Sequence, residues 1–313
     1  MTRGRQTRAR NKGRAINGIV ILDKPRGESS NAALQQVKRL FNANKAGHTG
    51  SLDPLATGVL PICLGEATKI SQFLLNSDKK YRVSIKLGIR TRTGDAEGEV
   101  IQQSDAVAVT TAEVKEALQR FTGPIKQVPP MYSAIKQNGV PLYKLAREGI
   151  EVERESRDIV IYSIDVLGLE NNELEIDVHC SKGTYIRTLA DDLGEVLGCG
   201  AHVSQLKRTQ AGVFTESESV TIQHLREIRD SSETEDFSGL DEYLIDMDAA
   251  ISDLPEVILP EVSAGWVKQG QAVLVRHLPE QGLVRLYQGE VFIGIGHILD
   301  DGRVAPRRMI VSH

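Results

Sequence analysis

Three segments of the chain have the apolar pattern of β-strands. Residues 81–88 (YRVSIKLG) alternate strictly and place four apolar side chains on one face, namely Tyr81, Val83, Ile85 and Leu87. Residues 173–180 (ELEIDVHC) alternate in the same way. Because successive side chains of a strand point to opposite faces, both segments predict half-buried strands. The uninterrupted apolar run in INGIVILDKP, which Pro25 closes, predicts a buried strand.

Three other segments predict helices that begin near a capping residue. Ser29 and Ser30 can cap a helix through about Phe41, and Thr110 can cap a helix that ends at Gly123. After SKGTY, apolar residues recur at helical spacing and form one stripe: Ile186, Leu189, Ala190, Leu193 and Leu197. Two glycines, shortly after this stripe, predict the end of the third helix.

Other parts of the chain break these patterns. Residues 47–58 are rich in Gly, Thr and Pro, which interrupt every period and predict an irregular loop. Residues 124–152 are rich in Pro and Lys and predict an excursion from the core, helical only near its end. From Pro255 onward, short β-rich segments alternate with Gly-containing turns. This last pattern predicts a small barrel of about sixty residues, with one short helix at its start.

Charge is distributed unevenly along a chain whose formal net charge is −4. Residues 1–45 contain eleven Lys or Arg and two acids, whereas residues 216–253 contain twelve acids and two Arg. An acidic protein can still present one basic face to phosphates, although solvated surface is the simpler interpretation of such runs. We expect residues 1–14 to form a disordered basic arm. The acidic stretch is expected to wrap the surface at a domain boundary.

The length and the cysteine content restrict the class of protein. With 313 residues, of which 40% are hydrophobic, the chain can form one large domain and one small one. Three scattered cysteines fit neither a disulfide framework nor a zinc site. We find no apolar run long enough for a membrane span and no signal sequence after the basic start. A reducing compartment follows, which in a bacterium is the cytoplasm.

The glycine-rich loop 47–58 is the best candidate for a functional site. It carries neither the phosphate-binding pattern of nucleoside triphosphatases nor the dinucleotide fingerprint. It does carry Asp53, which the following Pro54 holds in an extended conformation. A turn-forming Asp is the simpler interpretation of this local pattern.

Three further residues have simple structural interpretations of different strength. His48 has no partner at metal-binding spacing, and Tyr81 stands on the apolar face of a strand, where core packing is the default. Arg187 is harder to explain, because a positive charge at the start of a helix opposes the helix dipole. A carboxylate or a phosphate should compensate it.

Five motifs, in this order along the chain, give a more specific indication. They are AGHTGSLDPLATGVLPICLGEATK, YRVSIKLG, MYSAIK, CSKGTYIRTLADDLGEVLGCGAHV and RVAPRR. Together they closely resemble the TruB family of tRNA pseudouridine-55 synthases, from about Asn17 to the C-terminus. One departure is visible in GIRTRTGDAEG, where Arg92 and Gly94 replace residues that are often acidic or small and polar in the family. We expect Arg92 to affect RNA contacts rather than chemistry.

The resemblance implies a role for individual residues. Asp53 matches the catalytic aspartate, and Arg187 matches the arginine paired with it. Tyr81 matches the tyrosine that stacks on the target base, and His48 matches the histidine beside the flipped nucleotide. Two further matches belong to the substrate pocket: Tyr185 and Leu206. Lys24 lies in the LDKP element, where a structural or RNA-facing role is expected.

The resemblance also implies a fold and a reaction. The fold is α+β: a mixed sheet flanked by helices in residues 15–252, with an RNA-gripping insertion at about 124–152, and a PUA-like barrel at 253–313. The reaction converts uridine 55 in the T-loop of tRNA into pseudouridine by base flipping. It needs no cofactor and no metal. The partner is tRNA, and the protein is expected to act as a monomer without a protein partner.

Two other classes of protein remain open on the sequence. A non-catalytic RNA-binding or RNA-folding protein would share the basic arm and the barrel but would tolerate loss of Asp53. A synthase directed by a separate guide RNA would share the active site. The chain lacks the long extensions expected of the guided type. RNA folding is also compatible with the first assignment, as a second activity of the same enzyme.

Overall fold

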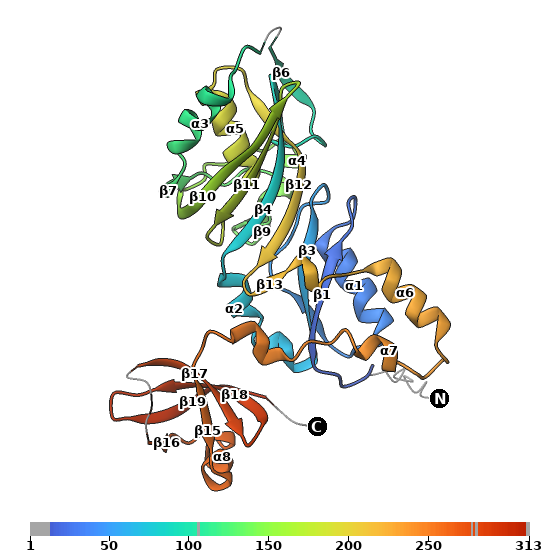
Figure 1. Cartoon of the computed structure of the whole chain (residues 1–313), viewed down its shortest axis with the longest axis vertical. Coiled ribbons are helices and arrows are strands. Elements are labelled where there is room, and N and C mark those ends of the chain that lie inside the picture. The colour runs from blue at the N-terminus through green and yellow to red at the C-terminus, as the bar shows by residue number, and fades with distance from the viewer. Residues whose placement is uncertain (1–12, 105–106, 277, 279–280, 311–313) are drawn as a thin grey trace, which may run out of the picture.

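The structure is a computed structural model that describes residues 13–104, 107–276, 278 and 281–310. Figure 1 shows an elongated molecule with a large part built on one long sheet and a small C-terminal part built on a second sheet. None of the helices in these described ranges is long and apolar enough to cross a membrane.

A ten-stranded mixed sheet forms the large part. Most of its strands follow one path, in the order β14 (Val220–Thr221), β1 (Gly18–Lys24), β3 (Thr57–Leu64), β12 (Ala201–Ala211), β4 (Lys79–Leu87), β11 (Glu173–Cys180), β10 (Arg157–Glu170) and β7 (Gly123–Gln127). Two short strands complete it: β2 (Ala46–His48) on β3, and β13 (Phe214–Thr215) on β12. The alternating segments 81–88 and 173–180 are strands β4 and β11, as predicted.

The strands β3 and β12 join the two halves of this sheet. They run parallel and pair only at Lys207↔Thr57 and Arg208↔Gly58, whereas β12 pairs with β4 along most of its length. The connection between β2 and β3, residues 49–56, therefore ends at this joint. It contains Asp53.

Helices flank both halves of the sheet (Figure 1). They are α1 (Ser30–Leu40) and α6 (Ile222–Ser231) beside β1, and α3 (Thr111–Gln119) and α5 (Ile186–Val196) beside β10 and β12. Ser29 caps α1 and Thr110 caps α3, as predicted. The prediction was wrong about the end of α3: the helix ends at Gln119, and Gly123, with φ +97°, begins strand β7 instead.

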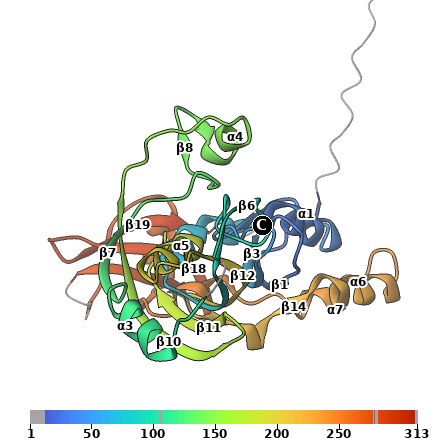
Figure 2. The same ribbon diagram turned by 90° about the horizontal axis from the view of Figure 1, so that it is seen from above.

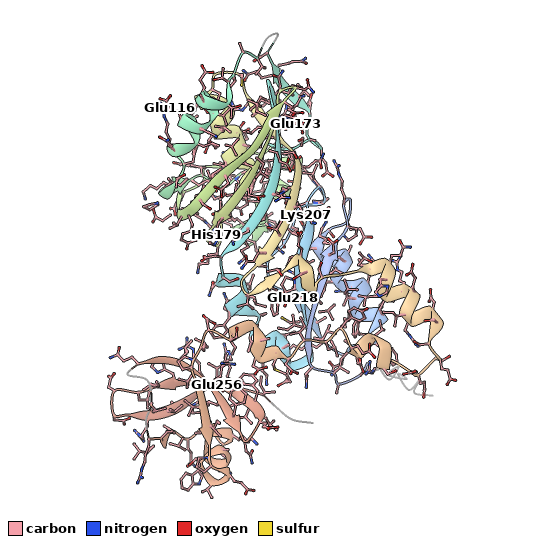
Figure 3. The ribbon with its side chains drawn as sticks, in the orientation of Figure 1. Glu116, Glu173, His179, Lys207, Glu218 and Glu256 are labelled. Atoms are coloured by element: carbon pink, nitrogen blue, oxygen red, sulfur yellow. The ribbon has the colours of Figure 1, made fainter. Side chains whose placement is uncertain are left out.

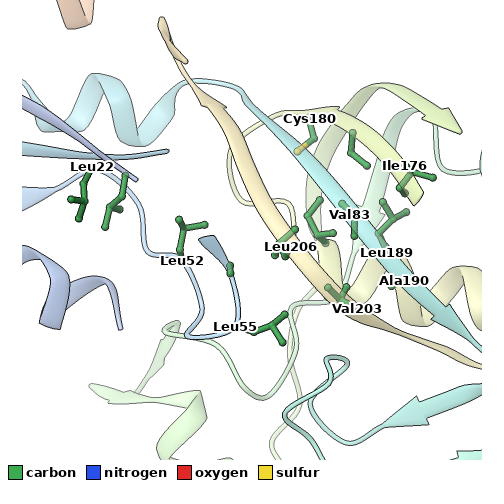
Figure 4. Packing of buried hydrophobic residues seen from close by; sticks show 14 of the residues in the cluster. Leu22, Leu52, Leu55, Val83, Ile176, Cys180, Leu189, Ala190, Val203 and Leu206 are labelled. Carbon is green, nitrogen blue, oxygen red and sulfur yellow. The ribbon is translucent and has the colours of Figure 1, made fainter. Parts of the chain in front are cut away.

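One apolar core runs through the large part and includes residues next to Asp53. Leu52 and Leu55 are almost fully buried in it, together with Leu206 of β12 and Leu189 of α5. Figure 4 shows the two loop leucines between the side chains of β1 and those of β12. Burial of each leucine contributes about 1.5–3 kcal/mol, so this segment is held in place although it has no regular structure.

Shorter elements lie between the main ones. They are the 3₁₀ helices Gly65–Lys69, Glu216–Glu218 and Met247–Ile251, helices α2 (Ser71–Asn76) and α7 (Ser238–Asp241), and the hairpin of β5 (Ile89–Thr91) with β6 (Val100–Gln103). Charged side chains of the large sheet, such as Glu173 and Lys207, lie at its surface (Figure 3).

Two predictions about the N-terminal third need correction. Most of the predicted disordered arm, residues 1–12, lies outside the described residues, but Arg14 is ordered: it bridges to Ala43 and forms an ion pair with Asp241. The loop 47–58 is not irregular throughout, because His48 lies on β2 and strand β3 begins at Thr57. Both short segments become strands by pairing with distant parts of the chain, which local patterns do not show.

The predicted excursion at 124–152 begins within the sheet. Its first residues belong to β7, which pairs with β10. The segment then leaves the sheet and forms β8 (Lys136–Gln137), β9 (Val140–Pro141) and α4 (Leu142–Arg147). In Figure 2, β8 and α4 stand clear of the rest of the large part. We call residues 128–156 the insertion.

The acidic stretch and the C-terminal part also differ in detail from the predictions. Residues 222–231 form α6, whose Ile222 and Leu225 join the main core, so this stretch belongs to the large part and does not merely border it. The C-terminal part is a curled five-stranded sheet in the order β15 (Glu256–Leu259), β17 (Gly282–Gln288), β18 (Val291–Ile298), β19 (Arg303–Met309) and β16 (Val273–Leu274). One helix, α8 (Glu261–Lys268), lies near its start, as predicted.

Replacing Gly58 by Ala tests how closely β3 and β12 must approach. The φ of Gly58 is +95°, and a Cβ atom there would lie 2.3 Å from the Arg208 carbonyl oxygen. Gly123 is a matched control, because its φ is +97° and no atom lies within 4 Å of its Cβ position. We expect Gly123→Ala to lower the free energy of unfolding by about 1–2 kcal/mol, and Gly58→Ala by about 1–3 kcal/mol more. Urea unfolding measures both losses, and equal losses would contradict a tight joint.

Candidate active site

The Asp53 loop, residues 49–56, is fixed by polar contacts as well as by its leucines. The Ser30 hydroxyl lies 2.7 Å from the backbone N–H of Leu52, which donates to it, and the same hydroxyl donates to the Leu52 carbonyl at 3.0 Å. The fully buried Lys24 ammonium donates to the carbonyls of Pro54 and Ala56. These contacts fix the backbone on both sides of Asp53 and leave its side chain 42% exposed.

Arg187 compensates the charge of Asp53. Its Nε atom lies 2.8 Å from Asp53 Oδ2, and its side chain is only 5% exposed. The other nitrogens of the guanidinium donate to the Thr93 carbonyl at 2.9 Å and to the Tyr132 carbonyl at 2.7 Å. The negative partner predicted for Arg187 is therefore present, and it is the loop aspartate.

A second carboxylate, that of Asp95, also lies beside Arg187, and the sequence did not indicate it. Asp95 Oδ2 lies 3.7 Å from Arg187 Nη1, and the Asp95 side chain is buried. Thr93 holds the Asp95 carboxylate through a 2.6 Å hydrogen bond from its hydroxyl. Asp95 lies in the GDAEG turn, where an Asp next to Gly is most simply interpreted as a turn former. Only the three-dimensional structure brings it beside Arg187.

The Asp53–Arg187 pair forms part of the wall of a pocket of about 380 Å³. Five of the six residues singled out from the sequence line this pocket: Asp53, Tyr81, Tyr185, Arg187 and Leu206. Tyr81 and Leu206 come from the neighbouring strands β4 and β12 and give the pocket an aromatic and an aliphatic surface. Tyr185 precedes α5, where Gln127 binds both its backbone N–H and its carbonyl.

Several lining residues were missed by the sequence analysis. Arg208, Lys79 and Ser133 contribute to the wall. Arg208 lies in β12, for which no strand was predicted, and Lys79 lies just before the predicted strand 81–88, so neither side chain had a sequence signal. Ser133 lies in MYSAIK, a motif that was quoted for the resemblance but not assigned a role.

His48 is placed differently from the other five. It lies on β2 and does not line the pocket. Its Nδ1 atom is buried without a hydrogen-bond partner among the described residues. Burial, and to a smaller extent the charge of Arg208, lower the pKa of His48. The side chain is therefore neutral near pH 7, and a role beside a flipped nucleotide stays a prediction.

Burial and the charge of Arg187 act in opposite directions on the pKa of Asp53. Burial raises the pKa of Asp53, and the charge and hydrogen bond of Arg187 oppose this rise. The side chain is open to the pocket but surrounded by protein on its other sides, which explains how a partly exposed group can be desolvated. Burial also raises the pKa of Tyr81, so its phenol is neutral.

The same residues give no obvious place for a metal ion. Within the described ranges, no group of three or more His, Cys, Asp or Glu side chains could hold one. The pocket combines instead one carboxylate, a permanently charged guanidinium and an aromatic ring. Such an arrangement can accept a flat, polar ring and place an ionised carboxylate beside it.

Comparisons with known proteins agree with this site and fold. Residues 38–186 match the TruB family pseudouridylate synthase N-terminal domain. Residues 187–252 match the tRNA pseudouridylate synthase B C-terminal domain, and residues 255–310 match the C-terminal domain of pseudouridine synthase II TruB.

Curated relatives match along almost the whole chain. The tRNA pseudouridine synthase B of Serratia proteamaculans (strain 568) is 54% identical over 312 residues, which cover 98% of this chain and 99% of the relative. The enzyme of the same name from Yersinia enterocolitica is 56% identical over 311 residues, with 98% and 94% covered.

Solved structures show the same fold at lower identity. A chain of an H/ACA RNP bound to a substrate RNA containing 2′-deoxyuridine has a TM-score of 0.71 and 24% identity, and the match covers 94% of this chain and 85% of that one. A Cbf5–Nop10–Gar1 complex gives a TM-score of 0.70 and 26% identity, with 95% and 84% covered.

The fold and the matching domains together define a pseudouridine synthase. The chain belongs to the TruB family of pseudouridylate synthases. The resemblance carried by the five sequence motifs is thereby confirmed, as is the α+β fold.

The dependence of turnover on pH tests the pairing of Asp53 with Arg187. If Asp53 is the catalytic carboxylate, as the resemblance implies, the saturated single-turnover rate should fall as Asp53 is protonated, because only the ionised form can act as a nucleophile or a base. Because burial raises the pKa of Asp53, we expect this fall at a pH above the ordinary value of 3.8. Arg187→Gln removes the opposing charge and should move the acid limb to still higher pH.

Thermal melting of both proteins at each pH provides the control, because it separates protonation of Asp53 from loss of the fold. An acid limb at the same pH in wild type and Arg187→Gln would show that Arg187 does not sustain the charge of Asp53.

Proposed function

We propose that this enzyme converts uridine to pseudouridine at position 55 in the T-loop of tRNA, with Asp53 as its catalytic carboxylate. The observation that carries the proposal is the Asp53–Arg187 pair on the wall of a pocket that also presents Tyr81 and Leu206. The relatives at 54–56% identity, whose names specify tRNA, support the choice of substrate.

The pocket suits an extruded pyrimidine. A uridine inside a folded T-loop is inaccessible, so the enzyme must flip it out of the stack. The Tyr81 ring offers a stacking surface, and stacking of a base on an aromatic ring contributes about 1–3 kcal/mol. Leu206 offers an apolar surface on the adjacent strand, and Tyr185 adds a polar one at the start of α5.

The chemistry is an isomerisation, so its atoms balance without another reactant. The C1′–N1 bond breaks, the base rotates, and a C1′–C5 bond forms; the proton leaves C5 and N1 gains one. Asp53 acts as a nucleophile at the sugar or the pyrimidine, or as a base at C2′. Arg187 favours the charged form of the carboxylate before it reacts and orients it.

The parts outside the pocket are assigned to RNA binding. The insertion carries exposed basic side chains, among them Lys136 and Lys144, and stands clear of the sheet where an RNA can reach it. The curled C-terminal sheet is assigned as a PUA-like domain, and its RVAPRR segment forms strand β19. We infer that the enzyme acts in the cytoplasm, as a monomer and without a protein partner. A second role in tRNA folding belongs to the same proposal.

A guide-directed synthase is the alternative that the fold alone would allow. The H/ACA RNP chain shares the fold at 24% identity, and this likeness says nothing about activity. The relatives named for tRNA are far more similar and span nearly the whole chain. A direct test is turnover in the absence of any guide.

Purified protein alone should modify a bare tRNA transcript. We expect pseudouridine at position 55, mapped by chemical modification and primer extension, and none in a matched transcript with cytidine at that position. Modification that requires an added guide RNA would contradict the proposal. If the protein bound the transcript but formed no pseudouridine, it would be a non-catalytic RNA-binding protein.

Asp53→Asn separates a catalytic from a structural aspartate. Asn is nearly isosteric and keeps the ability to form the turn, but its amide is neither a nucleophile nor a base. We expect the variant to fold and to bind tRNA about as well as wild type, with no detectable pseudouridine. Arg187→Lys should retain slow turnover, because the charge survives while the forked geometry is lost. Turnover by Asp53→Asn, with deamidation excluded by mass spectrometry, would remove Asp53 from the mechanism.

A further inference from the structure

Arg208 is among the largest fully buried side chains in the described part of the protein, at 1% exposure. It belongs to β12, where its neighbour Lys207 points to the surface and pairs with Glu216 at 2.7 Å. Arg208 points instead to the pocket side and contributes to the pocket wall. Burying a charged group costs free energy unless its donors are satisfied, so this position demands an explanation.

Two donors of Arg208 bind carbonyls at the two ends of the Asp53 loop. Nε donates to the Val59 carbonyl at 2.7 Å, after the loop. Nη2 donates to the Gly50 carbonyl at 3.2 Å, near its start. One rigid guanidinium therefore bridges the two ends of the loop that carries Asp53.

The backbone of Arg208 strengthens the same connection. It pairs with Gly58 in the short parallel joint of β3 and β12. Without a side chain, Gly58 allows the Arg208 carbonyl to approach to a distance that a Cβ atom would prevent. The loop is thus attached to residue 208 through both backbone and side chain.

Arg208 also contacts the proposed stacking surface. It stands opposite Tyr81 in the antiparallel register of β12 and β4. Residues directly opposite each other in an antiparallel pair place their side chains side by side on one face of the sheet, and the charge of Arg208 lowers the pKa of the Tyr81 hydroxyl against the larger effect of burial. The same residue thus binds the ends of the Asp53 loop and stands beside the residue on which the base would stack.

We propose that Arg208 is a positioning residue that sets the distance between the Asp53 carboxylate and the Tyr81 ring. The proposal rests on the roles assigned above to Asp53 and Tyr81. A base stacked on Tyr81 reacts only if the carboxylate lies at the right place beside it. Arg208 binds the loop that carries the carboxylate and stands opposite Tyr81 on the neighbouring strand. Only a planar fork with several donors can satisfy these partners together; a lysine ammonium keeps the charge but is a single point donor.

The test compares Arg208→Lys with Arg229→Lys. Arg229 is a matched control, because its guanidinium also bridges backbone carbonyls of one loop, at Glu233 and Asp236, but it does not line the pocket. A misplacement of about 1 Å can cost up to about 100-fold in rate. We therefore expect Arg208→Lys to lower the saturated single-turnover rate by about 10–100-fold with tRNA affinity unchanged. Arg229→Lys should leave both unchanged.

The Tyr81→Phe background separates positioning from general destabilisation. In this background the Tyr81 hydroxyl is absent. Arg208→Lys should therefore lower the saturated rate by a smaller factor than it does in wild type. Three outcomes would overturn the proposal. Arg208→Lys could have the saturated rate of wild type, or it could lower that rate by the same factor in the wild-type and Tyr81→Phe backgrounds. The loss of rate could also vanish when each variant is assayed at the same interval below its Tm. Turnover by wild type on the same transcript tests the proposed function separately. If wild type makes no pseudouridine, the proposed function is wrong, whereas a normal wild-type rate means that the variants test Arg208 alone.

Discussion

The candidate site depends on one ion pair, between Asp53 and Arg187, on the wall of the pocket. Burial raises the pKa of Asp53 and so favours its neutral form, which could not do the chemistry assigned to it. Arg187 opposes this effect at 2.8 Å, but a buried guanidinium needs partners of its own. It finds them in Asp95 and in the carbonyls of Thr93 and Tyr132, which come from two parts of the chain, the turn at 93–95 and the insertion. The ion pair is thus stable only in the complete fold.

The sheet topology also helps to fix the loop that carries Asp53. A carboxylate on a loop can be placed accurately only if the loop is fixed on every side. Leu52 and Leu55 hold it by burial, Ser30 and Lys24 hold its backbone, and the β3–β12 joint fixes its exit. A loop without regular structure thereby gains the rigidity of the two half-sheets that it connects.

Local elements could be predicted because their signals are local. Strict alternation identified β4 and β11, and capping residues placed the starts of α1 and α3. The uncompensated charge of Arg187 pointed to a negative partner, but only the resemblance singled out Asp53 as catalytic. Strand β2 was missed, because three residues become a strand only by pairing with β3. Asp95 and Arg208 were missed for the same reason, since their significance lies in contacts distant in sequence.

The insertion, for which we propose RNA binding, also contributes to the pocket. Its base supplies Ser133 and Ile135 to the pocket wall, and the neighbouring Tyr132 carbonyl accepts a hydrogen bond from Arg187. A shift of the insertion on binding RNA would therefore be felt at the guanidinium that holds Asp53. Since 2.7 Å leaves little freedom in that hydrogen bond, the insertion cannot move at its base without moving Arg187 or losing the bond. By this geometry, the RNA contacts proposed for the insertion are coupled, through the Tyr132 carbonyl, to the guanidinium that aligns Asp53.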